Sequence, residues 1–193
     1  EDTVKKEDQF SLSARYLTVY TLVSQQKYEE ALNEIDLVLE LDSSEINMFL
    51  FGSLCHQSLG NIDESNELAK KAVKIDPTKS DAYYILAQNY FELNDYIKAQ
   101  ENIETSLYYD NKYVKAHILK AKLDFEKGEQ EKAFKSLKEI SVKYPRDFEC
   151  KLELSKMYLK QGDTLEYLTN ARNALKMRPN NLELLKELSD IMY

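Results

Sequence analysis

The feature that most constrains this chain is a pattern of backbone-breaking residues that recurs every 34 residues. The prolines are separated by 68 and 34 residues: Pro77, Pro145 and Pro179. Three of the four glycines show the same separations: Gly60, Gly128 and Gly162. Proline restricts the backbone most and glycine least, so a spacing shared by both indicates a repeated structural unit.

On this period the chain divides into consecutive repeats without a gap. The predicted organisation is an N-terminal extension (1–11), repeats at 12–45, 46–79, 80–113, 114–147 and 148–181, and a capping helix (182–193). Each repeat reads as two helices. The turn between them carries Gly60-Asn61 or its counterpart, and breakers such as Pro77 end the second helix.

Side chains follow the same period. The eighth position of the repeats is mostly small, as at Ser53 and Ala87, and the twentieth is also mostly small, as at Ala31 and Ala99. Small residues at both positions let the two helices of a pair approach closely. Four glycines and three prolines are too few for a fold with many tight turns, so an all-helical chain is favoured.

The pattern resembles the tetratricopeptide repeat family, most closely over Tyr28–Asp42 and Ala69–Pro77. The resemblance implies an all-α fold: a right-handed α-α superhelix of five helix-turn-helix repeats plus a C-terminal helix. Residues 182–193 are expected to pack Leu185, Leu188 and Met192 on the fifth repeat. Polar residues replace the family's apolar ones at Arg15 and Thr18, and at His117, Lys120 and Asp124. These departures predict a rotated or loosely packed first helix in the fourth repeat.

No set of residues suggests catalysis. The histidines, His56 and His117, belong to different repeats, and no phosphate-binding loop, nucleophile elbow or zinc-protease motif occurs. Cys55 and Cys150 lie three repeats apart, so we expect them to stay unpaired. We therefore predict a non-enzymatic chain without a metal or a cofactor.

In the resembling family, the first helices line the inside of the superhelix and bind partners. The residues carried over from that pattern form the predicted partner-binding groove: Tyr16, Leu17, Tyr20, Leu50, Phe51, Leu54, Tyr84, Ile85, Gln88, Phe91, Ile118, Leu119, Lys122, Phe125 and Lys156. Most are apolar or aromatic, and monomeric proteins seldom expose such a row. The row predicts a groove for an amphipathic helix or an extended apolar segment of another protein.

One branch of the family clamps the carboxylate tail of chaperones with Lys, Asn and Arg side chains. No frame of the repeats supplies those residues here, since the first frame reads Tyr16, Tyr20, Phe51, Asp81 and Ile85. The sequence therefore argues against a chaperone-tail receptor.

The net charge and the distribution of apolar residues limit the kinds of partner that the chain can bind. The net charge of −8 disfavours nucleic acid, and no apolar run is long enough for membrane insertion. Residues 1–45 alone carry 4 basic and 11 acidic side chains, whereas 114–181 is mildly basic. Because residue 1 is Glu, we expect a processed chain or a fragment. The compartment stays open between cytoplasm, the default, and a bacterial periplasm or cell envelope reached through a removed signal.

Three functional classes remain open. A protein-binding adaptor is favoured. The first alternative is a self-assembling homo-oligomer whose groove is filled by another copy or by residues 1–11. The second is a carrier of a lipid or another apolar small molecule.

Overall fold

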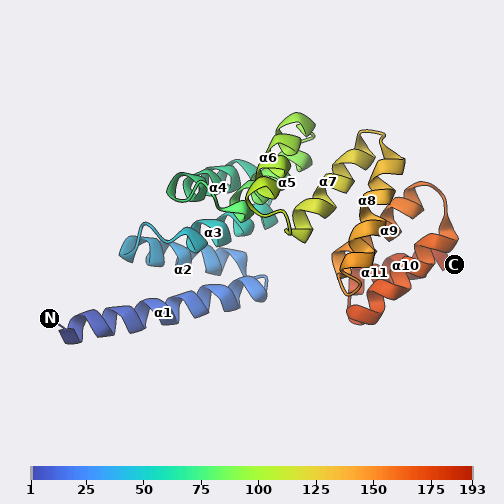
Figure 1. The fold of residues 1–193 in the computed structure, drawn as a ribbon. Coiled ribbons are helices and arrows are strands. Elements are labelled where there is room, and N and C mark those ends of the chain that lie inside the picture. The colour runs from blue at the N-terminus through green and yellow to red at the C-terminus, as the bar shows by residue number, and fades with distance from the viewer. Residues whose placement is uncertain (1, 193) are drawn as a thin grey trace. The chain divides into compact units, whose positions relative to one another are not determined.

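The computed structural model describes residues 2–192, with side chains from residue 12 to residue 191. It is helical throughout, and no strand occurs among the described residues (Figure 1). The helices are α1 (Asp2–Ser24), α2 (Tyr28–Leu41), α3 (Ile46–Ser58), α4 (Ile62–Ile75), α5 (Ser80–Glu92), α6 (Tyr96–Tyr109), α7 (Val114–Glu126), α8 (Gln130–Lys143), α9 (Phe148–Lys160), α10 (Thr164–Met177) and α11 (Leu182–Met192). The predicted all-α repeat fold is confirmed. Residues 2–11, expected as an extension, continue into the first repeat as part of α1.

The chain forms two compact units, which are described separately. Unit 1 spans Glu1–Asn111 and contains α1–α6. Unit 2 spans Lys112–Tyr193 and contains α7–α11.

The turn inside each helix pair uses a left-handed residue. Gly60 has φ +80°, its N–H donates to the Gln57 carbonyl at 3.0 Å, and the Asn61 N–H donates to the His56 carbonyl at 2.9 Å. These two bonds cap the last carbonyls of α3. Asn94 and Gln26 adopt φ of 59° and 60° at the equivalent position, although both carry a Cβ. The turn geometry therefore belongs to the repeat and not to glycine alone.

Helices within a pair pack through the small residues predicted at the eighth and twentieth positions. Ala87 and Ala99 are fully buried, and so are Ser53 and Ser65. The Ser53 hydroxyl donates to the Ser65 carbonyl at 2.7 Å, so the buried hydroxyl is satisfied. This close approach fixes the two layers of each unit.

The first helices form the inner layer. Within unit 1, α1 contacts α3 and α3 contacts α5, and within unit 2, α7 contacts α9. Among the described residues, the second helices make no such contacts with one another. Second helices are therefore splayed apart on the outside of each unit, and the exposed side of α1, α3 and α5 is here called the inner face of unit 1.

Apolar clusters bridge neighbouring repeats and hold each unit together. In unit 1, one cluster joins α1, α2 and α3 around Ile35, and another joins α3, α4 and α5 around Ala72. In unit 2, one joins α7, α8 and α9 around Leu137, and another joins α9, α10 and α11 around Ala171. Each repeat thus completes its core with the next, as expected for a solenoid.

Two expectations about helix packing need correction. In α11 Leu188 is buried as expected, but the second buried leucine is Leu184, whereas Leu185, expected in the stripe, is 43 % exposed. Met192 lies outside the residues whose side chains are described. The predicted loose packing of the fourth repeat does not hold either, because Ala121 and Leu123 of α7 are buried.

The polar departures in α7 are accommodated by a charge pair. Asp124 is buried in the chain, and its carboxylate accepts from the Lys132 ammonium at 3.0 Å. A buried carboxylate without such a partner would be costly. The neighbouring His117 and Lys120 help to line a cavity of about 340 Å³ between α7 and α8.

Candidate protein-interaction surfaces

The predicted groove residues divide into three groups by burial. Leu17 and Tyr20 are exposed, at 67 % and 60 %. Eight are partly exposed: Tyr16, Phe51, Leu54, Tyr84, Gln88, Phe91, Lys122 and Lys156. Five are buried: Leu50, Ile85, Ile118, Leu119 and Phe125. The buried five present almost no surface to a partner, so they are core residues rather than groove residues.

Leu17 and Tyr20 give the inner face of unit 1 its most exposed apolar surface. They lie three residues apart in α1 and so share one side of that helix. Beside them, Tyr16 and Phe51 pack at the edge of the cluster formed by α1, α2 and α3. Leu54 similarly borders the cluster formed by α3, α4 and α5. The apolar surface therefore continues from α1 onto α3.

Tyr16 is anchored at the edge of this face. Its hydroxyl donates to the Glu45 carboxylate at 3.2 Å, which ties α1 to the start of α3. Burial and the neighbouring Glu45 charge raise the pKa of Tyr16 to about 12. Tyr16 is therefore a neutral donor at physiological pH, and its ring is held in place for contact.

A buried polar network lies beneath the same face. The Asn89 amide nitrogen donates to the Ser65 hydroxyl at 2.8 Å and to the Asn66 amide oxygen at 3.0 Å. The Asn89 oxygen accepts from the Gln57 amide at 2.8 Å. These bonds join α3, α4 and α5, and satisfied networks of this kind fix one packing arrangement. The sequence pattern gave no signal for this network.

The first helices of unit 2, α7 and α9, carry charged side chains at some positions where those of unit 1 carry apolar ones. Lys122 of α7 pairs with Glu153 of α9 at 3.4 Å, and Lys160 pairs with Glu126. These ion pairs link the two first helices. They also neutralise charges that would otherwise be available to a partner. The predicted groove is thus apolar on unit 1 and charged on unit 2.

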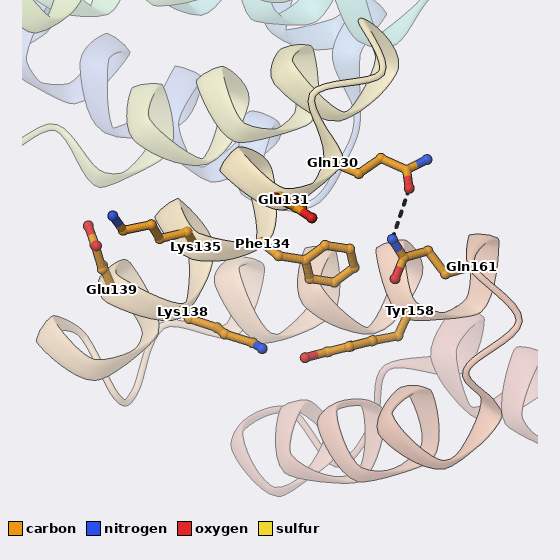
Figure 2. A pocket seen from close by; sticks show the side chains of 8 residues that line it. All are labelled: Gln130, Glu131, Phe134, Lys135, Lys138, Glu139, Tyr158 and Gln161. Carbon is orange, nitrogen blue, oxygen red and sulfur yellow. Dashed lines mark hydrogen bonds between the residues drawn. The ribbon is translucent and has the colours of Figure 1, made fainter.

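A second candidate surface lies on the outer side of unit 2. A cleft of about 680 Å³ opens between α8 and α9, with the rings of Phe134 and Tyr158 facing it (Figure 2). Their ring centroids lie 4.8 Å apart, and the Lys138 ammonium lies 5.8 Å from the Tyr158 centroid. Gln161 donates to Gln130 at 2.9 Å at one end of the cleft (Figure 2). The groove predicted from the sequence was made of first-helix residues alone and did not include this cleft.

Among the side chains described, the groups that could support catalysis do not converge on one site. Cys55 and Cys150 are free and buried in different units, and burial raises the pKa of each thiol to about 11. Between residues 2 and 192, no cluster of His, Cys, Asp and Glu suited to a metal ion occurs. Over the same range, every helix is too short or too polar to span a bilayer.

Comparison with known proteins supports the interpretation of the repeat. A tetratricopeptide repeat family model matches residues 57–123. The chain is 27 % identical over 89 residues to a wheat (Triticum aestivum) protein named Hsp70-Hsp90 organizing protein, covering 46 % of this chain and 15 % of that protein. It is 24 % identical over 178 residues to the TPR repeat-containing protein YpiA of Bacillus subtilis, covering 90 % of this chain and 42 % of the relative. The chain thus spans less than half the length of both relatives.

The fold has a close counterpart among solved structures. The tetratricopeptide protein TTC0263 of Thermus thermophilus superposes with a TM-score of 0.85 at 20 % identity, covering 94 % of this chain and all of that one. At this identity, the likeness concerns the fold. Proteins built on this repeat generally mediate protein–protein interactions and are typically non-enzymatic scaffolds.

Proposed function

Since the chain is a tetratricopeptide repeat protein, we propose that it is a protein-interaction scaffold that is not an enzyme. Its inner face of unit 1 binds an amphipathic helix or an extended apolar segment of a partner protein. The observation that carries the proposal is the pair Leu17 and Tyr20, two large apolar side chains exposed side by side on an inner-layer helix.

The exposure of apolar side chains supports unit 1 as the proposed site. Leu17 and Tyr20 supply the central contact, with Tyr16, Phe51 and Leu54 at its border. Such aromatic and aliphatic groups give large contact area at low entropic cost. Lys122 of unit 2 is already paired with Glu153, so it is not part of the proposed face.

Chaperone-tail recognition is not part of this proposal. A carboxylate clamp needs cations and amides on the inner face, and Tyr16, Tyr20 and Phe51 occupy the corresponding positions. The likeness to the wheat chaperone organizer covers 46 % of this chain and concerns the repeat.

A second copy of the chain is the alternative occupant. It is favoured by the opposite net charges of the units, −12 for residues 1–111 and +4 for 112–193. The chain's own N-terminal segment fits less well, because residues 2–11 continue α1 as one helix. That helix runs on along its axis and does not turn back over Leu17.

The test compares two double variants of matched chemistry. The Leu17→Ala/Tyr20→Ala variant removes the two exposed apolar side chains from the inner face. The control variant, Ile97→Ala/Tyr108→Ala, removes an aliphatic side chain and a tyrosine from α6, where they are 75 % and 82 % exposed. Affinity purification from the source cell, quantified by mass spectrometry, should lose its main partner by about tenfold or more with the first variant only.

Sedimentation distinguishes a second copy of the chain from a different partner protein as the occupant of the face. If the wild-type chain self-associates at micromolar concentration and the inner-face variant does not, the occupant is a second copy. If both variants retain the same partners in the same amounts and both are monomeric, the inner face of unit 1 is not the binding surface.

A further inference from the structure

We propose that the segment seated on the inner face of unit 1 is a basic amphipathic helix, with an apolar side flanked by Lys or Arg. This inference rests on the proposed function and specifies the chemistry of the partner at the same site. It follows from the distribution of charge around that face.

Unit 1 is strongly acidic. Residues 1–111 carry 21 acidic and 9 basic side chains, a net charge of −12. Charge of this size produces a field that extends over roughly 8–10 Å at physiological salt, so it reaches across a bound helix. A partner with acidic flanks would be repelled, and one with basic flanks would be steered to the face.

Among the side chains that the structure describes, the inner-layer helices of unit 1 offer no unpaired cation to a partner. Helices α3 and α5 contain no Lys or Arg. In α1 the one such residue with a described side chain is Arg15, and its guanidinium donates to the Glu34 carboxylate at 2.7 Å. A partner helix therefore meets apolar surface without competing positive charge.

Carboxylates gather where the inner-layer helices begin. Asp42 and Asp76 lie in the turns ahead of α3 and α5, and Glu45 is the residue before α3. Ser44 donates its hydroxyl and N–H to Asp42, and Thr78 does the same for Asp76, which holds the pKa of each carboxyl below its usual range. Asp42 and Asp76 therefore stay ionised at neutral pH. Together with Glu45, they form an acidic edge where α3 and α5 begin.

The dimensions suit a single helix. Helices of 13 residues such as α3 and α5 present a face about 20 Å long, which is about four turns of a bound helix. The matching ligand carries apolar residues at i, i+3 or i+4 and i+7, with Lys or Arg on the side that meets the acidic edge.

Three model peptides of about 18 residues test the inference. The first is an amphipathic Leu/Lys helix, and the second is its Leu/Glu counterpart with the same leucine positions. The third has the Leu/Lys composition in an order without helical periodicity. Each is titrated by fluorescence anisotropy with the full chain, with Leu17→Ala/Tyr20→Ala and with the matched Ile97→Ala/Tyr108→Ala variant.

The proposal expects the Leu/Lys helix to bind about tenfold or more tightly than either other peptide, and more weakly as salt is raised. The inner-face variant should lose that binding about tenfold, and the α6 variant should keep it. Equal affinity for the Leu/Glu and Leu/Lys helices would overturn the charge preference and leave the proposed function standing. Equal affinity for the scrambled peptide, or equal loss in both double variants, would overturn the helix-binding face itself, as would no binding by any peptide.

Discussion

Asp42 and Asp76 occupy the same place in successive repeats and make the same turn. In each, the carboxylate accepts from a hydroxyl and an N–H two residues later, at 2.7 and 2.9 Å for Asp42 and at 2.7 and 2.8 Å for Asp76. Asx turns of this kind position the chain between the second helix and the next first helix. A single residue type thus sets the connection on which repeat stacking depends.

The Asp76 turn should give the stability of the fold an acid dependence. Hydrogen bonds from the Thr78 hydroxyl and N–H lower the pKa of Asp76 in the folded state. Its contribution to stability is therefore fully present above the unfolded pKa of about 3.9 and is lost as the pH falls through the folded pKa. Asp76→Asn should lower the melting temperature at pH 7, and the gap to wild type should close below about pH 3.9.

Thermal melts followed by circular dichroism at pH 7, 5 and 3 check this prediction. Asp36→Asn is the control, because the exposed Asp36 in α2 makes no comparable turn. A gap between Asp76→Asn and wild type that is the same at pH 7, 5 and 3 would rule out the ionised turn as its cause.

Tyr167 occupies the twentieth position of the fifth repeat, where the other repeats have Ala or Ser. Its ring is fully buried, and its hydroxyl has no hydrogen-bond partner. An unmade buried hydrogen bond costs about 1–3 kcal/mol. Tyr167→Phe should therefore leave the free energy of unfolding unchanged or raise it by up to about 1 kcal/mol, as measured by chemical denaturation. A loss above about 1 kcal/mol would mean that the hydroxyl is bonded in solution.

At the scale of helices, neighbours decide which residues of a repeat reach the surface. Leu17, Ile85 and Leu119 share the sixth position of their repeats, yet Leu17 is exposed and the other two are buried. Among the described residues, α5 packs against α3, α4 and α6, whereas α1 packs against α2 and α3. The same position is therefore less crowded on α1, and a repeat pattern read from sequence assigns all three the same environment.

Helix α11 supplies a register test. We propose that it shields the apolar surface of α10, since Leu184 and Leu188 pack against Tyr167 and Ala171. Leu184→Ala should reduce the free energy of unfolding by about 2–5 kcal/mol, because it leaves a cavity in that cluster. The neighbouring Leu185→Ala should cost less than about 1 kcal/mol. Denaturant titrations measure the free energy of unfolding of both variants. A larger loss for Leu185→Ala than for Leu184→Ala would show that Leu185 is the packed residue, as the sequence had predicted.

The sequence predicted the helices well and the site less well, for physical reasons. Turn geometry depends on local residues such as Gly60 and Pro77, so their 34-residue spacing located the helix pairs. The burial of Leu50 or Phe125 depends on contacts with other helices. The cleft beside Phe134 and the Asn89 network likewise require packing between helices, which no periodicity encodes.

At the scale of the whole molecule, the two units differ strongly in net charge. Unit 1 has a net charge of −12 and unit 2 of +4. Like charges within one compact unit repel and destabilise it. The acidic unit should therefore respond more strongly to ionic strength than the weakly basic one.

Hydrogen exchange of the full chain, followed by mass spectrometry, measures this response. Raising NaCl from about 20 to 200 mM shortens the screening length from roughly 20 to 7 Å. Amides of α3–α6 should then exchange several-fold more slowly, because repulsion falls, and those of α7–α10 should change little. Equal slowing in both units would point to a general salt effect on apolar burial instead.

The lysine-free inner face of unit 1 has a practical consequence for mapping partners by chemical cross-linking. Helices α3 and α5 contain no lysine, and α1 has none after Lys6. Amine-reactive reagents would therefore tether a partner through lysines of the second helices or turns, such as Lys71 and Lys79, which lie outside the inner-layer helices. A photoactivatable amino acid placed at Ser13 or Ser24, both exposed in α1, would instead form its adducts from within the face.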